Sequence, residues 1–241
     1  MNIRAIAEAI LELLYPTRAK CLGCGDERGC DEPFLCEECR NLLRPVQILT
    51  VRNEWKERGL ESAAFVYYYG RPIKGLIRSF KFHSVRILAG SMAQDMAELI
   101  KEKAAGDCDM MIPVPLHPAR LRERGFNQAE VLARALAEKC GMEMRTDILD
   151  RIRRTKQQAK LSGIRRMGNT EGAFRAKKDL TGRRVLLVDD VVTTGSTLCA
   201  CAEALKKAGA REVHAVALAG SRRYRQCGWH VYRSKEKVNR R

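Results

Sequence analysis

The clearest succession of an apolar segment, a polar segment and a helical pattern lies between residues 185 and 207. Val185–Val188 is a run of apolar residues without alternation, which predicts a strand buried on both faces in a parallel sheet. Two carboxylates, Asp189 and Asp190, follow where we expect this strand to end. The polar turn that comes next consists of Thr193, Thr194, Gly195, Ser196 and Thr197. A helical pattern over Leu198–Lys207 completes a strand, turn and helix, the order in which α/β proteins present ligands at the carboxyl edge of a sheet.

This polar turn has the composition of an anion site. The unpaired N–H groups at a helix N-terminus attract anions, Gly195 allows close approach of the backbone, and the hydroxyls add donors. The carboxylates of Asp189 and Asp190 would repel a phosphate, so sugar hydroxyls or a hydrated Mg²⁺ are their natural partners. The alternative is an ordinary capped helix with solvated acidic residues. A cap needs only one hydroxyl or carboxylate, and this turn has many more polar residues than that.

The run from Val185 to Thr197 resembles the 5-phosphoribosyl-1-diphosphate (PRPP) binding motif of type I phosphoribosyltransferases. Four apolar residues, two acidic residues, two variable residues and Thr-Thr-Gly-Ser-Thr fill every position of that pattern. The resemblance implies an α/β fold, with a parallel twisted sheet flanked by helices. It also implies that Asp189 and Asp190 hold the ribose hydroxyls as the catalytic pair, and that Thr193–Thr197 surround the 5′-phosphate. It does not identify the acceptor.

Apolar periodicity predicts the remaining elements. Asn127 and Glu130 have the spacing of a capping box that opens a helix over Gln128–Cys140. A stripe of Leu88, Met92, Met96 and Leu99 indicates a helix packed on the core. The other expected elements are an amphipathic helix over 1–16, a strand over Ala63–Tyr69, a helix ending near Phe82, and strands over Met110–Val114 and Val213–Leu218.

Two Cys-x-x-Cys pairs near the beginning of the chain have zinc-ribbon spacing. The pairs are Cys21 with Cys24 and Cys36 with Cys39, separated by eleven residues. Four thiolates around one tetrahedral Zn²⁺ make a closed structural site, which leaves no position for catalysis. A module of this size needs the metal to fold. Cys30, between the pairs, is either a bystander or a substitute ligand.

Basic residues gather at three further places, the first of which follows a predicted strand. Arg120, Arg122 and Arg124 follow the predicted strand Met110–Val114, where we expect a loop at the ligand edge. They form either a charged surface or a clamp for a diphosphate, which suits guanidinium geometry. Lys81 is either a solvated surface lysine or a fourth diphosphate ligand.

The segment Arg151–Arg166 contains seven basic residues and no acidic one. A basic segment can close over a polyanionic ligand and exclude water. The alternative is non-specific binding of nucleic acid, although the segment has no aromatic residue for base stacking. Residues 221–241 form a second basic segment, a C-terminal tail.

The cysteine pairs, the segment Val114–Gln128 (Val-Pro-Leu-His-Pro-Ala-Arg-Leu-Arg-Glu-Arg-Gly-Phe-Asn-Gln) and the PRPP motif together resemble the ComF/GntX family. Its members are zinc-ribbon phosphoribosyltransferase-like proteins, some of them linked to DNA uptake in competent bacteria. The resemblance implies that Arg151–Arg166 is the flexible loop that closes over the site. We therefore expect four parts: a helix over 1–16, a zinc knuckle over 17–45, a phosphoribosyltransferase-like domain over 60–220 and a basic tail over 221–241, the last of which is a departure from the family.

Length and charge are consistent with this organisation. A chain of 241 residues can form one full core and a small appendage, and its net charge of +16 favours anionic partners. No apolar run approaches the roughly 20 residues of a membrane span. Charges interrupt Met1–Tyr15, so we expect no secretory signal and a cytoplasmic location.

Two functions fit these features. One is a Mg²⁺-dependent phosphoribosyltransferase that uses PRPP and an unidentified acceptor. The other is a non-catalytic module that senses PRPP or a nucleotide and binds single-stranded DNA or competence proteins. No base that would activate an acceptor stands out in the sequence, so these residues leave both functions open.

Overall fold

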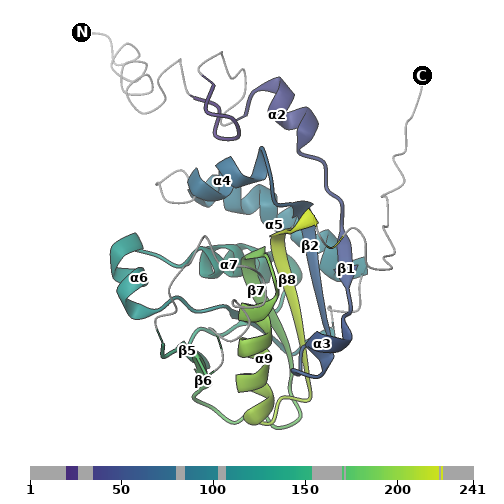
Figure 1. The fold of residues 1–241 in the computed structure, drawn as a ribbon, viewed down its shortest axis with the longest axis vertical. Helices are drawn as coiled ribbons and strands as arrows, with labels where there is room; N and C mark the ends of the chain where they lie inside the picture. The colour runs from purple at the N-terminus through teal and green to yellow at the C-terminus, as the bar shows by residue number, and fades with distance from the viewer. Residues whose placement is uncertain are drawn as a thin grey trace. The chain divides into compact units, whose positions relative to one another are not determined.

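The computed structural model describes residues 20–26, 35–79, 85–102, 107–153, 170, 172–222 and 224 (Figure 1). The chain divides into two compact units, Met1–Arg44 with Gly70–Phe82 and Pro45–Tyr69 with His83–Arg241. Several predictions lie outside the described residues: the helix over 1–16, Cys30, Lys81, residues 154–169 of the basic segment and residues 225–241 of the tail.

The larger unit is built on a six-stranded sheet. Only the edge strand β1 pairs antiparallel, with β2, and the other four pairings are parallel. In spatial order the strands are β1 (Ile48–Thr50), β2 (Ser62–Tyr68), β8 (Glu212–Gly220), β7 (Arg184–Val192), β3 (Met110–Pro113) and β4 (Glu143–Met144). A separate antiparallel pair consists of β5 (Leu149–Arg151) and β6 (Phe174–Ala176). The predicted α/β class is confirmed, with a mostly parallel sheet.

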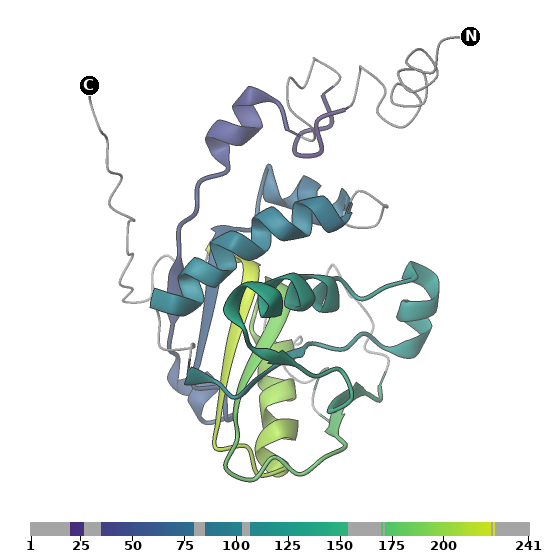
Figure 2. The same cartoon turned by 180° about the vertical axis from the view of Figure 1, so that it is seen from behind.

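Helices cover both faces of this sheet. α5 (Val85–Glu102) and α7 (Gln128–Cys140) pack side by side on one face, and α9 (Ser196–Lys207) lies on the other (Figures 1 and 2). Two shorter helices are α3 (Asn53–Lys56) and α6 (Pro118–Arg124). The apolar run Val185–Val188 of β7 is fully buried, as expected for a central strand with helices on both sides.

The strand β7 is longer than the sequence predicts. It continues through both carboxylates to Val192, with Asp189 opposite Ala217 and Val191 opposite Ala219 of β8. The expected strand end at Asp189 is therefore wrong. Parallel pairing satisfies the backbone groups of these residues whatever their side chains are. The carboxylates consequently lie within the last four residues of the strand. Only the three residues Thr193–Gly195 separate β7 from α9.

Helix α7 begins where the sequence predicts, with Asn127 as its N-cap, but the capping box is incomplete. The Asn127 side chain accepts a 3.2 Å hydrogen bond from the N–H of Ala129 and donates one of 3.0 Å to the carbonyl of Val114. Glu130 contacts Arg134 instead of returning to the Asn127 backbone. The helix α6 replaces the loop expected after β3. On α5, Met92, Met96 and Leu99 are buried as predicted.

The smaller unit contains α2 (Glu37–Leu42) and α4 (Ile73–Ser79). Gly75 of α4 lies against the turn of the first cysteine pair, because an added Cβ atom would come within 2.2 Å of the Leu22 carbonyl oxygen and 2.4 Å of that of Gly23. Such proximity of two backbones requires glycine at position 75. The helix that follows β2 in the chain thus packs with the cysteine pairs.

Candidate functional site

The predicted anion site is a short turn between β7 and α9. Together with Asp189, residues 191–198 of this region line an open hollow. Gly195 caps α9 in the left-handed conformation, with φ of 78°. Thr194 Oγ1 lies 2.5 Å from Ser196 Oγ, which joins two of the hydroxyls in one network. The turn therefore offers backbone N–H groups and hydroxyls together at a helix N-terminus.

The two carboxylates lie beside this hollow, at the carboxyl edge of β7. The N–H of Asp190 donates a 2.8 Å hydrogen bond to Asp189 Oδ1. Burial and the charge of Asp190 raise the pKa of Asp189 well above its ordinary value. Burial also raises the pKa of Asp190. A partner that donates hydrogen bonds to both carboxylates, such as a diol, would relieve this unfavourable pairing.

Helix α6 divides the three predicted arginines between two faces. Arg120 and Arg124 are four residues apart and share a face, whereas Arg122 points away from that face. Arg124 is near enough to Asp190 to oppose the burial-driven rise of its pKa. Burial lowers the pKa of Arg151, and the positive charge of Arg120 nearby lowers it further. The structure thus brings Arg124 toward Asp190 and Arg120 toward Arg151, while Arg122 lies on the other face of α6.

The first residue of the basic segment and a residue that follows the segment both contact the site. Arg151, which opens the segment, has its guanidinium carbon 5.3 Å from the centre of the Phe174 ring, and its charge favours ionised Asp189. Thr170 lies after the segment, and its buried hydroxyl donates a 3.2 Å hydrogen bond to the Ser196 carbonyl at the start of α9. Arg151 therefore lies near Asp189, and Thr170 lies against the start of α9.

Two aromatic residues that the sequence analysis missed lie behind the turn. Trp55 of α3 packs on Gly195, and Tyr224 donates a 3.0 Å hydrogen bond to the Thr193 carbonyl. Both are buried in the larger unit. No local pattern marks either residue, because their relation to the turn depends on contacts between distant parts of the chain.

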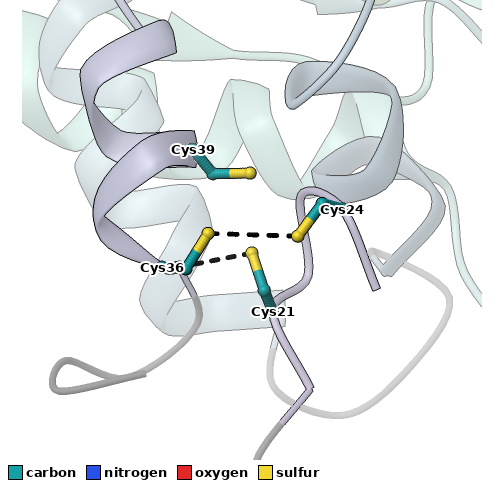
Figure 3. A group of neighbouring side chains, drawn as sticks. All are labelled: Cys21, Cys24, Cys36 and Cys39. Atoms are coloured by element: carbon teal, nitrogen blue, oxygen red, sulfur yellow. Dashed lines mark hydrogen bonds between the residues drawn. The ribbon is translucent and has the colours of Figure 1, made fainter. Parts of the chain in front are cut away.

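The four predicted zinc ligands converge in the smaller unit (Figure 3). The sulfur atoms of Cys21, Cys24, Cys36 and Cys39 all lie within 4.8 Å of one another, and those of Cys24 and Cys36 are 3.9 Å apart. Zn–S bonds of about 2.3 Å in a tetrahedron place sulfur atoms about 3.8 Å apart. The cluster therefore fits one Zn²⁺.

The surroundings shift the pKa values of two of these thiols in opposite directions. Burial disfavours the thiolate form of Cys21. Hydrogen bonds from backbone N–H groups, the first being that of Cys36 at 3.3 Å from the Cys21 sulfur, outweigh this effect and lower the pKa of Cys21 to about 6. Burial, followed by bonds to the other thiols, raises the pKa of Cys39. The eight cysteines among the described residues are all free thiols, so no disulfide competes for these ligands.

Comparison with known proteins identifies the family. The family described as "Phosphoribosyl transferase domain" matches residues 121–238. Competence protein F of Haemophilus influenzae is 30% identical over 206 residues, which cover 83% of this chain and 83% of that protein. The chain belongs to the ComF/GntX family. The resemblance found in the sequence is confirmed, and the larger unit carries the family's type I phosphoribosyltransferase domain.

Two further members extend this comparison. Competence protein ComFC of Streptococcus pneumoniae is 30% identical over 216 residues, which cover 86% of this chain and 90% of that protein. The DNA utilization protein YhgH of Salmonella typhi is 34% identical over 149 residues, which cover 60% of this chain and 66% of that protein. This ComF/GntX member therefore belongs among proteins named for competence and DNA utilization. Within its described part, no helix has both the length and the apolar character needed to cross a membrane.

Proposed function

We propose that this ComF/GntX protein binds PRPP with Mg²⁺ and transfers its phosphoribosyl group to an unidentified acceptor, with release of diphosphate. The observation that supports this most directly is the position of the acidic pair beside the hydroxyl turn, at the carboxyl edge of β7. A ligand with a phosphate, a neighbouring diol and a second anionic group satisfies all of these groups at once. The family's phosphoribosyltransferase domain supports the same ligand class.

Each group of residues contacts a different part of the ligand. The N–H groups and hydroxyls of Thr193–Thr197 receive the 5′-phosphate, and Asp189 and Asp190 accept hydrogen bonds from the ribose hydroxyls. Arg120 and Arg124 face the diphosphate. Lys81 remains a candidate for the same role and lies outside the described residues, whereas Arg122 lies on the far face of α6 and is not assigned this role. When bound with the ligand, Mg²⁺ supplies further positive charge to the diphosphate.

The proposed reaction is a substitution at the anomeric carbon. The bond from this carbon to the diphosphate oxygen breaks, the diphosphate leaves with the electron pair, and the acceptor nucleophile forms the new bond and releases its proton. Positive charge develops on the ribose in the transition state. The ionised pair Asp189 and Asp190 stabilises that charge through the ribose hydroxyls, and the arginines stabilise the departing diphosphate, which is electrostatic catalysis.

Calorimetry of PRPP binding tests the site directly. We expect micromolar affinity with Mg²⁺, a large loss of affinity in EDTA, and at least about a hundredfold loss in the double variant Asp189→Asn/Asp190→Asn, because two charged hydrogen-bond acceptors are removed. Asparagine preserves the size of both side chains. Absence of binding to the wild-type protein, or equal binding to the variant, would refute the proposed site.

A second candidate is a non-catalytic module that senses PRPP or a nucleotide and contacts single-stranded DNA or DNA-uptake proteins. The names of the relatives, competence protein and DNA utilization protein, favour this alternative. Release of diphosphate from PRPP in the presence of a panel of nucleophiles distinguishes the two, because a sensor binds without turnover. If the protein binds DNA, the logarithm of its affinity should fall linearly with the logarithm of the salt concentration. Binding should disappear when the basic residues of Arg151–Arg166 are neutralised.

We also propose that residues 17–45 fold around one structural Zn²⁺. The convergence of four thiols supports this proposal. Metal analysis of the purified protein should find one zinc per chain, and Cys36→Ser with Cys39→Ser should lose it. A protein that retains its full zinc content in this double variant would show that the metal lies elsewhere.

A further inference from the structure

The hydroxyl turn rests on the edge of a tryptophan ring. A Cβ atom at Gly195 would come within 2.5 Å of Trp55 Cζ2, 2.6 Å of Cε2 and 2.8 Å of Nε1. Position 195 is therefore closed to a side chain by this ring, in addition to the φ of 78° that already favours glycine. Trp55 is only 3% exposed, so the ring is a fixed part of the core. The contact limits how far the turn can move toward the core.

A tyrosine holds the first residue of the same turn. The hydroxyl of Tyr224 donates to the carbonyl oxygen of Thr193 at 3.0 Å, and the residue has no exposed surface. This bond directs the carbonyl toward the aromatic ring. A carbonyl oxygen turned into the hollow would repel a phosphate, so the bond keeps a partial negative charge away from the anion site.

The two aromatic residues support each other. Their rings meet edge to face, with centroids 5.6 Å apart and an interplanar angle of 75°. Arg52 lies over both, its guanidinium carbon 5.8 Å from the centre of Trp55 and 5.9 Å from that of Tyr224. Phe65 of β2 also packs on Tyr224, with ring centroids 6.0 Å apart. These contacts fix the orientation of both rings behind the turn.

We infer that Trp55 and Tyr224 are positioning residues, which hold the turn Thr193–Thr197 in the one shape that receives a phosphate monoester. They come from opposite ends of the larger unit, one before β2 and the other after β8, and meet only at this turn. The inference rests on the proposed function for the identity of the ligand. The shape of the empty turn can be tested without any ligand.

Hydrogen exchange of the ligand-free protein is the first test. The variant Tyr224→Phe keeps the ring and loses only the hydroxyl. We expect the amides of Cys199 and Ser221, which donate to the carbonyls of Gly195 and Val192 at the turn, to exchange about fivefold faster, as loss of one hydrogen bond implies. Tyr67→Phe is the matched control, because it also removes a buried tyrosine hydroxyl, one that donates to Asp95 on α5. We expect this control to leave exchange of the same two amides unchanged.

Binding of ribose 5-phosphate is the second test. In a Trp229→Phe background Trp55 is the only tryptophan, so its emission reports on the turn. We expect ribose 5-phosphate to shift this emission, and Tyr224→Phe to weaken its binding by about fivefold. Trp55→Phe, followed by calorimetry, should retain part of the affinity that Trp55→Ala loses, because phenylalanine preserves an aromatic contact.

The outcomes separate this inference from the proposed function. Unchanged exchange of the Cys199 and Ser221 amides in Tyr224→Phe, or an equal change in Tyr67→Phe, overturns the positioning role. A wild-type protein that binds neither ribose 5-phosphate nor PRPP overturns the proposed function instead. In that case faster exchange in Tyr224→Phe alone would still establish what holds the turn.

Discussion

The helix backbone at Gly75 lies against the carbonyl oxygen of Leu22, which an added Cβ atom would approach to 2.2 Å. Leu22 lies inside the first cysteine pair, between Cys21 and Cys24, so α4 and the metal site form one packed structure within the smaller unit. This contact predicts that a change on α4 affects how the cysteines hold a metal.

Gly75→Ala should release zinc faster than the wild-type protein, by about tenfold. The added methyl group must push the two backbones apart, and overpacking of this kind costs about 1–3 kcal/mol. The rate of zinc transfer to a chromophoric chelator measures the effect. Gly90→Ala is the matched control, because it also places alanine in a helix but has open space within 4 Å of the new atom. If both variants release zinc equally fast, the contact does not support the metal site.

Asp189→Asn should stabilise the ligand-free protein at neutral pH. Burial and the charge of Asp190 raise the pKa of Asp189 above its ordinary value of about 4. The folded protein then binds the proton more tightly than the unfolded chain, so this group lowers stability as pH rises through the raised pKa. Thermal unfolding at pH 7.5 should show a gain of a few degrees, roughly 1 kcal/mol, which disappears near pH 4.

Asp147→Asn should change the stability of the protein in the opposite direction. Hydrogen bonds from Arg145 and Lys178 lower the pKa of this exposed carboxyl, so its ionised form stabilises the folded protein above the ordinary pKa. The variant should lose stability at pH 7.5 and show no loss in acid. A destabilised Asp189→Asn at neutral pH would contradict the electrostatic account of the acidic pair.

The arginines of α6 should contribute unequally to diphosphate binding. Arg120→Gln and Arg124→Gln should each weaken PRPP binding by about tenfold or more, because a hydrogen bond to a charged group contributes about 1.5–3 kcal/mol. Arg122→Gln removes the same charge from the far face of the helix and should change affinity by less than about twofold. Calorimetry with PRPP and with inorganic diphosphate measures both effects. Equal losses in all three variants would indicate a general electrostatic attraction.

Asn127→Ala should lower the free energy of unfolding by about 2 kcal/mol. The side chain both caps α7 and holds the Val114 carbonyl after β3, and it is 9% exposed. Asn127→Asp keeps the acceptor for the cap and loses the donor, so its effect should be intermediate. Urea unfolding of the three proteins measures the series. A full loss in Asn127→Asp would mean that the bond to Val114 carries the whole effect.

Several elements escaped the sequence analysis for a common reason. The strands β1, β4, β5 and β6 have only two or three residues, too few for a periodic pattern, and their formation depends on pairing with other strands. The extension of β7 through Asp189 has the same origin, since the neighbouring strand β8 supplies its backbone partners. Local propensity does not contain this information.

Local sequence patterns were enough to predict the features that depend on neighbours within a few residues. These are the buried run Val185–Val188, the polar turn after it, the start of α7 at Asn127 and the two cysteine pairs. Other features became visible only in the folded chain: Gly75 packs on the first cysteine pair, and Trp55 and Tyr224 meet behind the turn. Each of these contacts joins segments far apart in the chain, and close packing of backbones and rings leaves no periodic trace in the sequence.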